Sequence, residues 1–216
     1  MIISASRRTD IPSYYSEWFF NRIKEGYVCV RNPMNIHQVG KISLSPDVVD
    51  GIVFWTKNPT PMLNRLDEIS QYNYYFQFTV NSYNTDIETN VPSKNDVIIP
   101  TFQKLSKQIG KDRVIWRYDP ILLNEKYTID YHLTYFKMMV DKLADYTEKC
   151  TISFIDLYRN IQKNMSSLQI SSPSNEQQEE IIAKFVEIAN EYGIYIDTCA
   201  EKVVFNDKEL QRKWSN

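Results

Sequence analysis

Histidine is scarce in this chain. His37 and His132 are the only histidines among 216 residues, so the sequence predicts neither a multi-histidine metal site nor a Ser-His-Asp triad. His132 falls in a predicted helix, four residues before Phe136. His37 falls in a predicted loop, where it is either solvated or reaches over a binding site.

Closely spaced cysteines and glycine-rich phosphate loops are also missing. Cys29, Cys150 and Cys199 form no C-x-x-C pair, so we predict no metal site and no disulfide framework, and we expect a reducing cytoplasm. Cys199, close to Asp197, is either a small core residue or a reactive thiol. No G-x-G-x-x-G or G-x-x-x-x-G-K-[ST] follows the first predicted strand, which argues against dinucleotide-binding and P-loop folds.

Long apolar runs and a strong charge imbalance are absent too. No run approaches the roughly 18 residues of a membrane span, and the formal net charge is −2. Neither a membrane nor a nucleic acid is therefore expected as a partner, and any anion must be bound by a local cluster. Hydrophobic residues make up 43% of the chain, which is enough for one α/β domain over residues 1–216.

Strand-like and helix-like segments alternate about six times along the chain, which predicts parallel strands joined by right-handed crossovers. The predicted strands are 2–6, 51–56, 74–81, 113–118, 150–155 and 194–199. The predicted helices run from Pro12 to the stop at Gly26, over 61–72, 100–109, 128–146 and 158–165, and from the linker 171–174 to Gly193. A β-excursion is expected near 27–46.

Polar side chains end almost every predicted strand. Both an open sheet and a barrel place ligands there, but a barrel gathers nearly all of the strands. The polar groups are Ser4, Ser6 and Arg8; Thr56 and Lys57; Gln77, Thr79 and Asn81; Arg117 and Asp119; Ser153 and Asp156; and Asp197 and Glu201. We therefore predict a (β/α) barrel-like fold, a partial or incomplete TIM-type barrel with about six parallel strands.

The strand over 74–81 is the most informative one. Gln77, Thr79 and Asn81 share one face, and the apolar side chains of Phe76, Phe78 and Val80 share the other. In a sheet covered by helices the apolar face should meet the helices. The polar face is therefore expected to line a wet or functional site.

The charged side chains at the strand ends predict an anion-binding site, since guanidinium and ammonium groups hold phosphate or carboxylate. Carboxylates enclosed in such a site serve as general acids or bases. The predicted substrate-binding residues are Arg7, Arg8, Lys57, Gln77, Thr79, Asn81 and Arg117. The predicted catalytic residues are Asp119, Asp156, Asp197 and Glu201. The alternative is that Arg117 with Asp119, and Arg7 or Arg8 with Asp10, form ion pairs that only lock the strand ends.

Several short strings carry a family resemblance. SASRRTDIP, VRNP, VFWTKNP, YYFQFT, VIWRYDPI, ISFIDLY and DTCAE occur in this order. Together they resemble the bacterial family "domain of unknown function 1848" over essentially the whole chain up to Glu201. The resemblance implies no particular reaction.

Longer members of that family look similar to radical-SAM proteins, because they carry a C-terminal tail with closely spaced cysteines. The resemblance implies S-adenosylmethionine and a [4Fe-4S] cluster for those relatives. Here the residues after Glu201 read KVVFNDKELQRKWSN, without a cluster motif. We expect either a truncated member or one in which the tail is dispensable.

Three functional hypotheses remain open. The first is a partial barrel of radical-SAM type, and the second is a cluster-independent hydrolase or lyase acting on a phosphorylated or carboxylated metabolite. The third is a non-catalytic binding domain or remnant, in which Tyr72, Tyr74, Tyr75 and Trp214 form either a partner surface or core. The oligomeric state is left open.

Overall fold

The computed structural model describes residues 1–6, 9–35, 37–155 and 168–199. The chain divides into two compact units. Unit 1 comprises Met1–Arg117 and Lys142–Lys149, and unit 2 comprises Tyr118–Asp141 and Cys150–Asn216. Within the described residues, no helix has the length and apolar character needed to cross a membrane.

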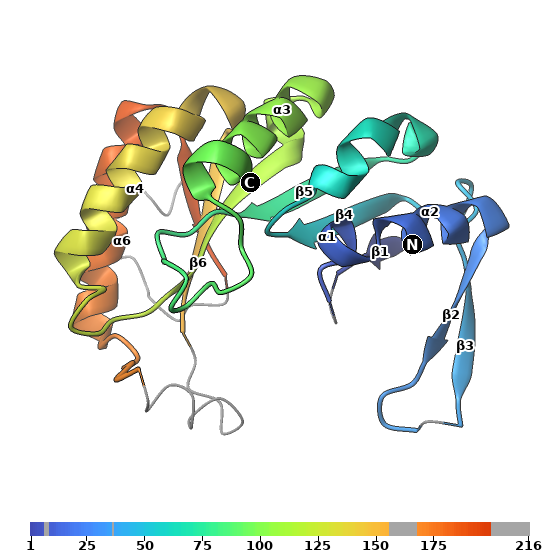
Figure 1. The fold of residues 1–216 in the computed structure, drawn as a ribbon, viewed down its shortest axis with the longest axis horizontal. Coiled ribbons are helices and arrows are strands. Elements are labelled where there is room, and N and C mark those ends of the chain that lie inside the picture. The colour runs from blue at the N-terminus through green and yellow to red at the C-terminus, as the bar shows by residue number, and fades with distance from the viewer. Residues whose placement is uncertain (7–8, 36, 156–167, 200–216) are drawn as a thin grey trace, which may run out of the picture. The chain divides into compact units, whose positions relative to one another are not determined.

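Within the described residues, six strands are hydrogen bonded in the order β1-β4-β5-β6-β7-β8 (Figure 1). They are β1 (Ile2–Ser4), β4 (Gly51–Thr56), β5 (Tyr74–Thr79), β6 (Val114–Ile121), β7 (Lys149–Phe154) and β8 (Tyr195–Thr198). The pairs β1–β4, β4–β5 and β5–β6 are parallel. Strand order follows chain order without reversal, as in a barrel-type sheet and unlike a doubly wound sheet with a switch point. The predicted α/β fold with about six parallel strands is confirmed.

The helices alternate with these strands largely as predicted. They are α1 (Ile11–Tyr14), α2 (Ser16–Glu25), the 3₁₀ helix η1 (Thr60–Ile69), the π-helical turn η2 (Lys94–Ile98), α3 (Ile99–Ile109), the 3₁₀ turns η3 (Lys111–Arg113) and η4 (Ala144–Tyr146), α4 (Ile129–Leu143) and α6 (Asn175–Glu191). The helix predicted between Pro12 and Gly26 is interrupted, because Tyr15 has non-helical angles of φ −132° and ψ 24°. Gly26, at φ 74°, ends α2 in the left-handed conformation that glycine adopts without strain. The helix predicted over 158–165 lies outside the described residues.

Unit 1 is built on an aromatic core beneath one face of its strands. Burial alternates along β5, where Phe76 and Phe78 are fully buried while Gln77 and Thr79 are half-buried. The Phe76 ring stacks on Phe54 of β4 at 4.8 Å, and Phe78 meets Phe102 of α3 at 5.1 Å. The apolar face of β5 therefore packs against a helix, as the alternation predicts.

An antiparallel hairpin of β2 (Tyr27–Arg31) and β3 (Val39–Ser43) occupies most of the segment in which we expected a β-excursion. Figure 1 shows the hairpin following α2 and projecting away from it.

In unit 2, α4 and α6 lie side by side and pack on the second half of β6 (Figure 1). The rings of Phe136 and Phe185 stack at 3.8 Å, and both meet Tyr118 edge-on at 5.6 and 5.4 Å. The assignment of the chain to a single domain stays a prediction.

Candidate functional site

A cavity of about 500 Å³ opens in unit 1 where strands β1, β4 and β5 end. Ser6 comes from just after β1, Trp55 and Thr56 from the end of β4, and Thr79 from the end of β5. Lys57, directly after β4, also lines the cavity. In parallel α/β folds this edge of the sheet carries the ligand site, and the volume is in the usual range for small-molecule pockets.

The cavity rim is fixed by the cap of α1. The Asp10 carboxylate accepts hydrogen bonds from the backbone N–H of Ser13 at 2.9 Å and of Lys57 at 2.7 Å. The Ser13 hydroxyl donates to the carbonyl oxygen of Asn58 at 2.8 Å. Both oxygens of Asp10 therefore bind backbone N–H groups, and they tie α1 to the residues that follow β4.

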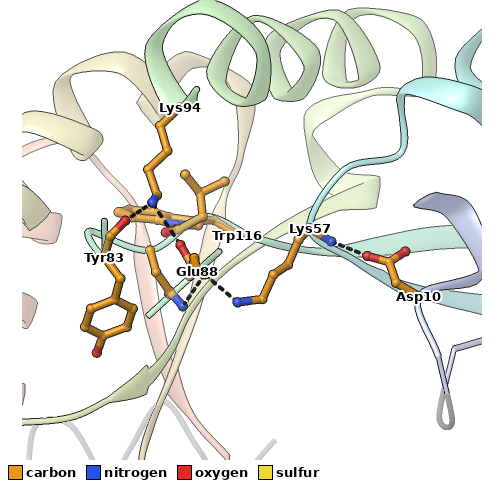
Figure 2. A network of polar contacts seen from close by, with 8 residues as sticks. Asp10, Lys57, Tyr83, Glu88, Lys94 and Trp116 are labelled. Atoms are coloured by element: carbon orange, nitrogen blue, oxygen red, sulfur yellow. Dashed lines mark hydrogen bonds and ion pairs between the residues drawn. The ribbon is translucent and has the colours of Figure 1, made fainter. Parts of the chain in front are cut away.

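A buried carboxylate, Glu88, lies between two lysines (Figure 2). Lys57 Nζ pairs with Glu88 Oε1, and Lys94 Nζ pairs with Glu88 Oε2 at 2.8 Å. Asn81 Nδ2 donates to Glu88 Oε1 at 3.4 Å, and Lys94 Nζ also donates to the carbonyl oxygen of Tyr83. The polar loop after β5 is thus held by charged contacts to residues on both sides of it.

The charges of this cluster do not cancel. Burial raises the pKa of Glu88, but the ammonium groups of Lys57 and Lys94 outweigh burial and hold its pKa below the ordinary value. Glu88 is therefore an anion shared by two cations. The Lys57 side chain is 42% exposed and that of Glu88 only 4%, so the excess positive charge is accessible at Lys57.

A second polar group lies behind the cavity wall. The guanidinium of Arg117 lies 4.6 Å from the centre of the Trp55 ring, and Arg117 Nη1 donates to Gln77 Oε1 at 3.3 Å. Arg117 is 4% exposed, whereas Trp55 is 37% exposed. Arg117 therefore supports Trp55 from the buried side.

Five of the predicted substrate-binding residues are described, all in unit 1. Lys57 and Thr79 line the cavity, and Asn81 contacts the Glu88 that pairs with Lys57. Gln77 and Arg117 contact each other, next to the cavity residue Trp55. Arg7 and Arg8 lie outside the described residues.

Two of the four predicted catalytic carboxylates, Asp119 and Asp197, do not line this cavity. Asp119 and Asp197 are half-buried residues of β6 and β8 in unit 2. Asp156 and Glu201 lie outside the described residues. Their catalytic role stays a prediction.

Sequence reasoning missed Glu88, Lys94 and the exposure of Trp55. Glu88 and Lys94 belong to a polar loop and the turn after it, where nothing in the local pattern distinguishes a buried ion pair from solvated charge. The run GIVFWT predicts the strand over 51–56 but not which side chain stays open; Trp55 lies opposite Gln77 in the β4–β5 register, on the polar face. The alternation in β5 was the signal that could have identified this.

His132 is a core residue of unit 2. Its Nε2–H donates to the carbonyl oxygen of Leu122 at 2.9 Å, and Nδ1 is 2.8 Å from the Tyr118 hydroxyl, which donates to the neutral ring. Burial lowers the pKa of His132, although the Leu122 hydrogen bond opposes this. His37 is exposed on the hairpin loop.

The described residues offer no donor set for a metal or cluster. Cys29 is exposed on β2, Cys150 is buried in β7, and Cys199 is exposed just after β8. In the ranges that the structure describes, no three His, Cys, Asp or Glu side chains are placed to hold a metal ion. These residues do not fit a [4Fe-4S] cluster.

The aromatic run considered as a partner surface is largely core. Tyr72 is 5% exposed and Tyr74 is 7% exposed, and the Tyr72 hydroxyl donates to the carbonyl oxygen of Leu44 at 2.6 Å. Tyr75 is half-buried, and Trp214 lies outside the described residues.

A protein-family model described as "Domain of unknown function (DUF1848)" matches residues 2–214. No curated protein matches the chain.

Proposed function

The chain belongs to the DUF1848 family, whose model matches residues 2–214. From the cavity in unit 1, we propose that this chain is a barrel-type enzyme domain that binds an anionic small molecule. The ligand would lie at the C-terminal ends of β1, β4 and β5, with its phosphate or carboxylate at Lys57. We also propose a cytoplasmic location, because the sequence has only three cysteines and no C-x-x-C spacing among them.

One observation carries the proposal: an accessible lysine lines a cavity at the strand ends, while its counter-ion Glu88 is shared with a second lysine, Lys94. Because Lys94 also neutralises Glu88, Lys57 can turn to a ligand without leaving Glu88 unpaired in the interior. An incoming phosphate or carboxylate would then gain a charge-assisted hydrogen bond at low desolvation cost.

Asp119, Asp156, Asp197 and Glu201 remain our candidates for proton exchange, and Arg7 and Arg8 remain candidates for holding the ligand anion. One alternative is a radical-SAM-type reaction, by analogy with longer members of the family. The other is a hydrolase or lyase reaction that needs no cluster. Anion binding at Lys57 is common to both.

The test is ligand-induced thermal stabilisation of the full chain. We expect phosphate-containing and carboxylate-containing metabolites to raise the Tm of the wild type, and Lys57→Ala to abolish the rise because the accessible ammonium is lost. Lys111→Ala is the matched control, since Lys111 forms an exposed pair with Glu148 at 3.5 Å in the same unit. The absence of any shift across a broad panel, or an equal loss in both variants, would contradict the proposal.

A further inference from the structure

We infer that the ligand of the unit 1 cavity carries a planar aromatic ring as well as its anionic group, and that its class is a nucleoside monophosphate. The base would stack on Trp55, and the phosphate would lie at Lys57. The inference rests on the proposed function, because it takes the anion site at Lys57 as given.

The exposure of Trp55 is the first observation. Its strand neighbours Phe54 and Thr56 are 0% and 4% exposed, whereas Trp55 is 37% exposed and lines the cavity. Covering a large, exposed apolar ring with another ring is favourable, because apolar surface is removed from solvent. Proteins that bind single-stranded nucleic acid use such exposed aromatic rings to stack bases of every type.

The Trp55 ring is also contacted from the protein interior. Arg117 lies over the Trp55 ring at 4.6 Å and is itself bound by Gln77. Arg117 is only 4% exposed, so it covers the buried part of the indole. The part of the indole that faces the cavity stays open. A cation on one side of the ring fixes its orientation and leaves the other side for a ligand.

The rest of the cavity suits the other parts of a nucleotide. Tyr14, Val91 and Pro92 supply aromatic and apolar wall, and Lys57 supplies the cation. The buried Ser6 hydroxyl has no hydrogen-bond partner in the described part of the chain, so a sugar hydroxyl could satisfy it. A pocket of about 500 Å³ has room for base, sugar and phosphate together.

Isothermal titration of the full chain with adenosine 5′-monophosphate and with ribose 5-phosphate tests the inference. The two probes share the phosphate and sugar and differ in the base. We expect the nucleotide to bind about tenfold more tightly, the usual size of one stacking contact. Equal affinities would overturn the inference while leaving the proposed anion site intact, whereas no binding of either probe would remove both.

Variants of Trp55 test whether the tighter binding of the nucleotide depends on this ring. Trp55→Leu should abolish the preference for the nucleotide over ribose 5-phosphate, while Lys57→Ala should weaken the binding of both probes. Trp55→Phe keeps a ring beside Arg117 and should retain part of the preference. A Trp55→Leu variant that weakens both probes equally would count against stacking, and the wild-type comparison stands even if that variant does not fold.

Discussion

At the scale of single residues, Glu88 is a buried charged side chain that stabilises the fold through its contacts. It is 7% exposed, and its carboxylate is contacted by Lys57, Lys94 and Asn81. Its partners come from the end of β4, the end of β5 and the start of η2. Glu88 thus connects three segments and sets the position of Lys57, which lines the cavity.

Replacing Glu88 should be costly, because removing one partner of a buried ion pair leaves the other charges uncompensated. The lysines retain some access to water, at 42% and 20% exposure of their side chains, so we expect Glu88→Ala to lower the free energy of unfolding by about 2 kcal/mol. Urea denaturation measures this.

Glu148→Ala is the control for that measurement. Glu148 forms an exposed pair with Lys111, and its loss should change the free energy of unfolding by less than about 0.5 kcal/mol. Equal effects of the two variants would show that the ion pairs of Glu88 contribute no more to the free energy of unfolding than a surface ion pair does.

At the scale of elements, the short helix α1 is stabilised by its cap and by its attachment to β4. Four residues are too few for a helix to persist on its own propensity. Asp10 accepts from Ser13 N–H inside the helix and from Lys57 N–H outside it. One side chain therefore sets both the helix and the backbone at the cavity lysine.

Asp10→Ala should lower the free energy of unfolding by about 1–2 kcal/mol, since it removes an N-cap. It should also weaken anion binding, because the backbone of Lys57 loses its anchor. Asp10→Asn keeps one acceptor oxygen, which can satisfy only one of the two N–H groups at a time, and should recover part of the stability. Thermal unfolding measures the effect on stability, and ligand titration measures the effect on affinity. Unchanged affinity in Asp10→Ala would show that the α1 cap does not contribute to anion binding.

At the scale of the whole molecule, stability should depend on pH through two buried groups. His132 has a folded-state pKa below its ordinary value, so its contribution is present above the unfolded pKa near 6.5 and is lost as pH falls toward the folded pKa. Glu88 also has a lowered pKa, and its contribution is lost at lower pH, below the ordinary glutamate pKa near 4.5.

We therefore expect the free energy of unfolding to fall between pH 7 and pH 5.5 with a slope of at most about 1.4 kcal/mol per pH unit from the single proton of His132. Urea denaturation at a series of pH values measures the slope. In His132→Gln this part of the profile should flatten, although the variant is less stable at pH 7. A slope unchanged in His132→Gln would assign the pH dependence to other groups.

The sequence by itself determined the order of strands and helices, the helix stop at Gly26 and the two faces of β5. These features are local, because side-chain periodicity and backbone preference are encoded within a few residues of each other. Only the tertiary structure decided that Glu88 would bind Lys57 and Lys94, that Trp55 would be open on the polar face, and that His132 would be enclosed by Tyr118 and Leu122. Each of those contacts joins residues separated along the chain or by a loop, and pairing at that separation depends on where the folded backbone places them.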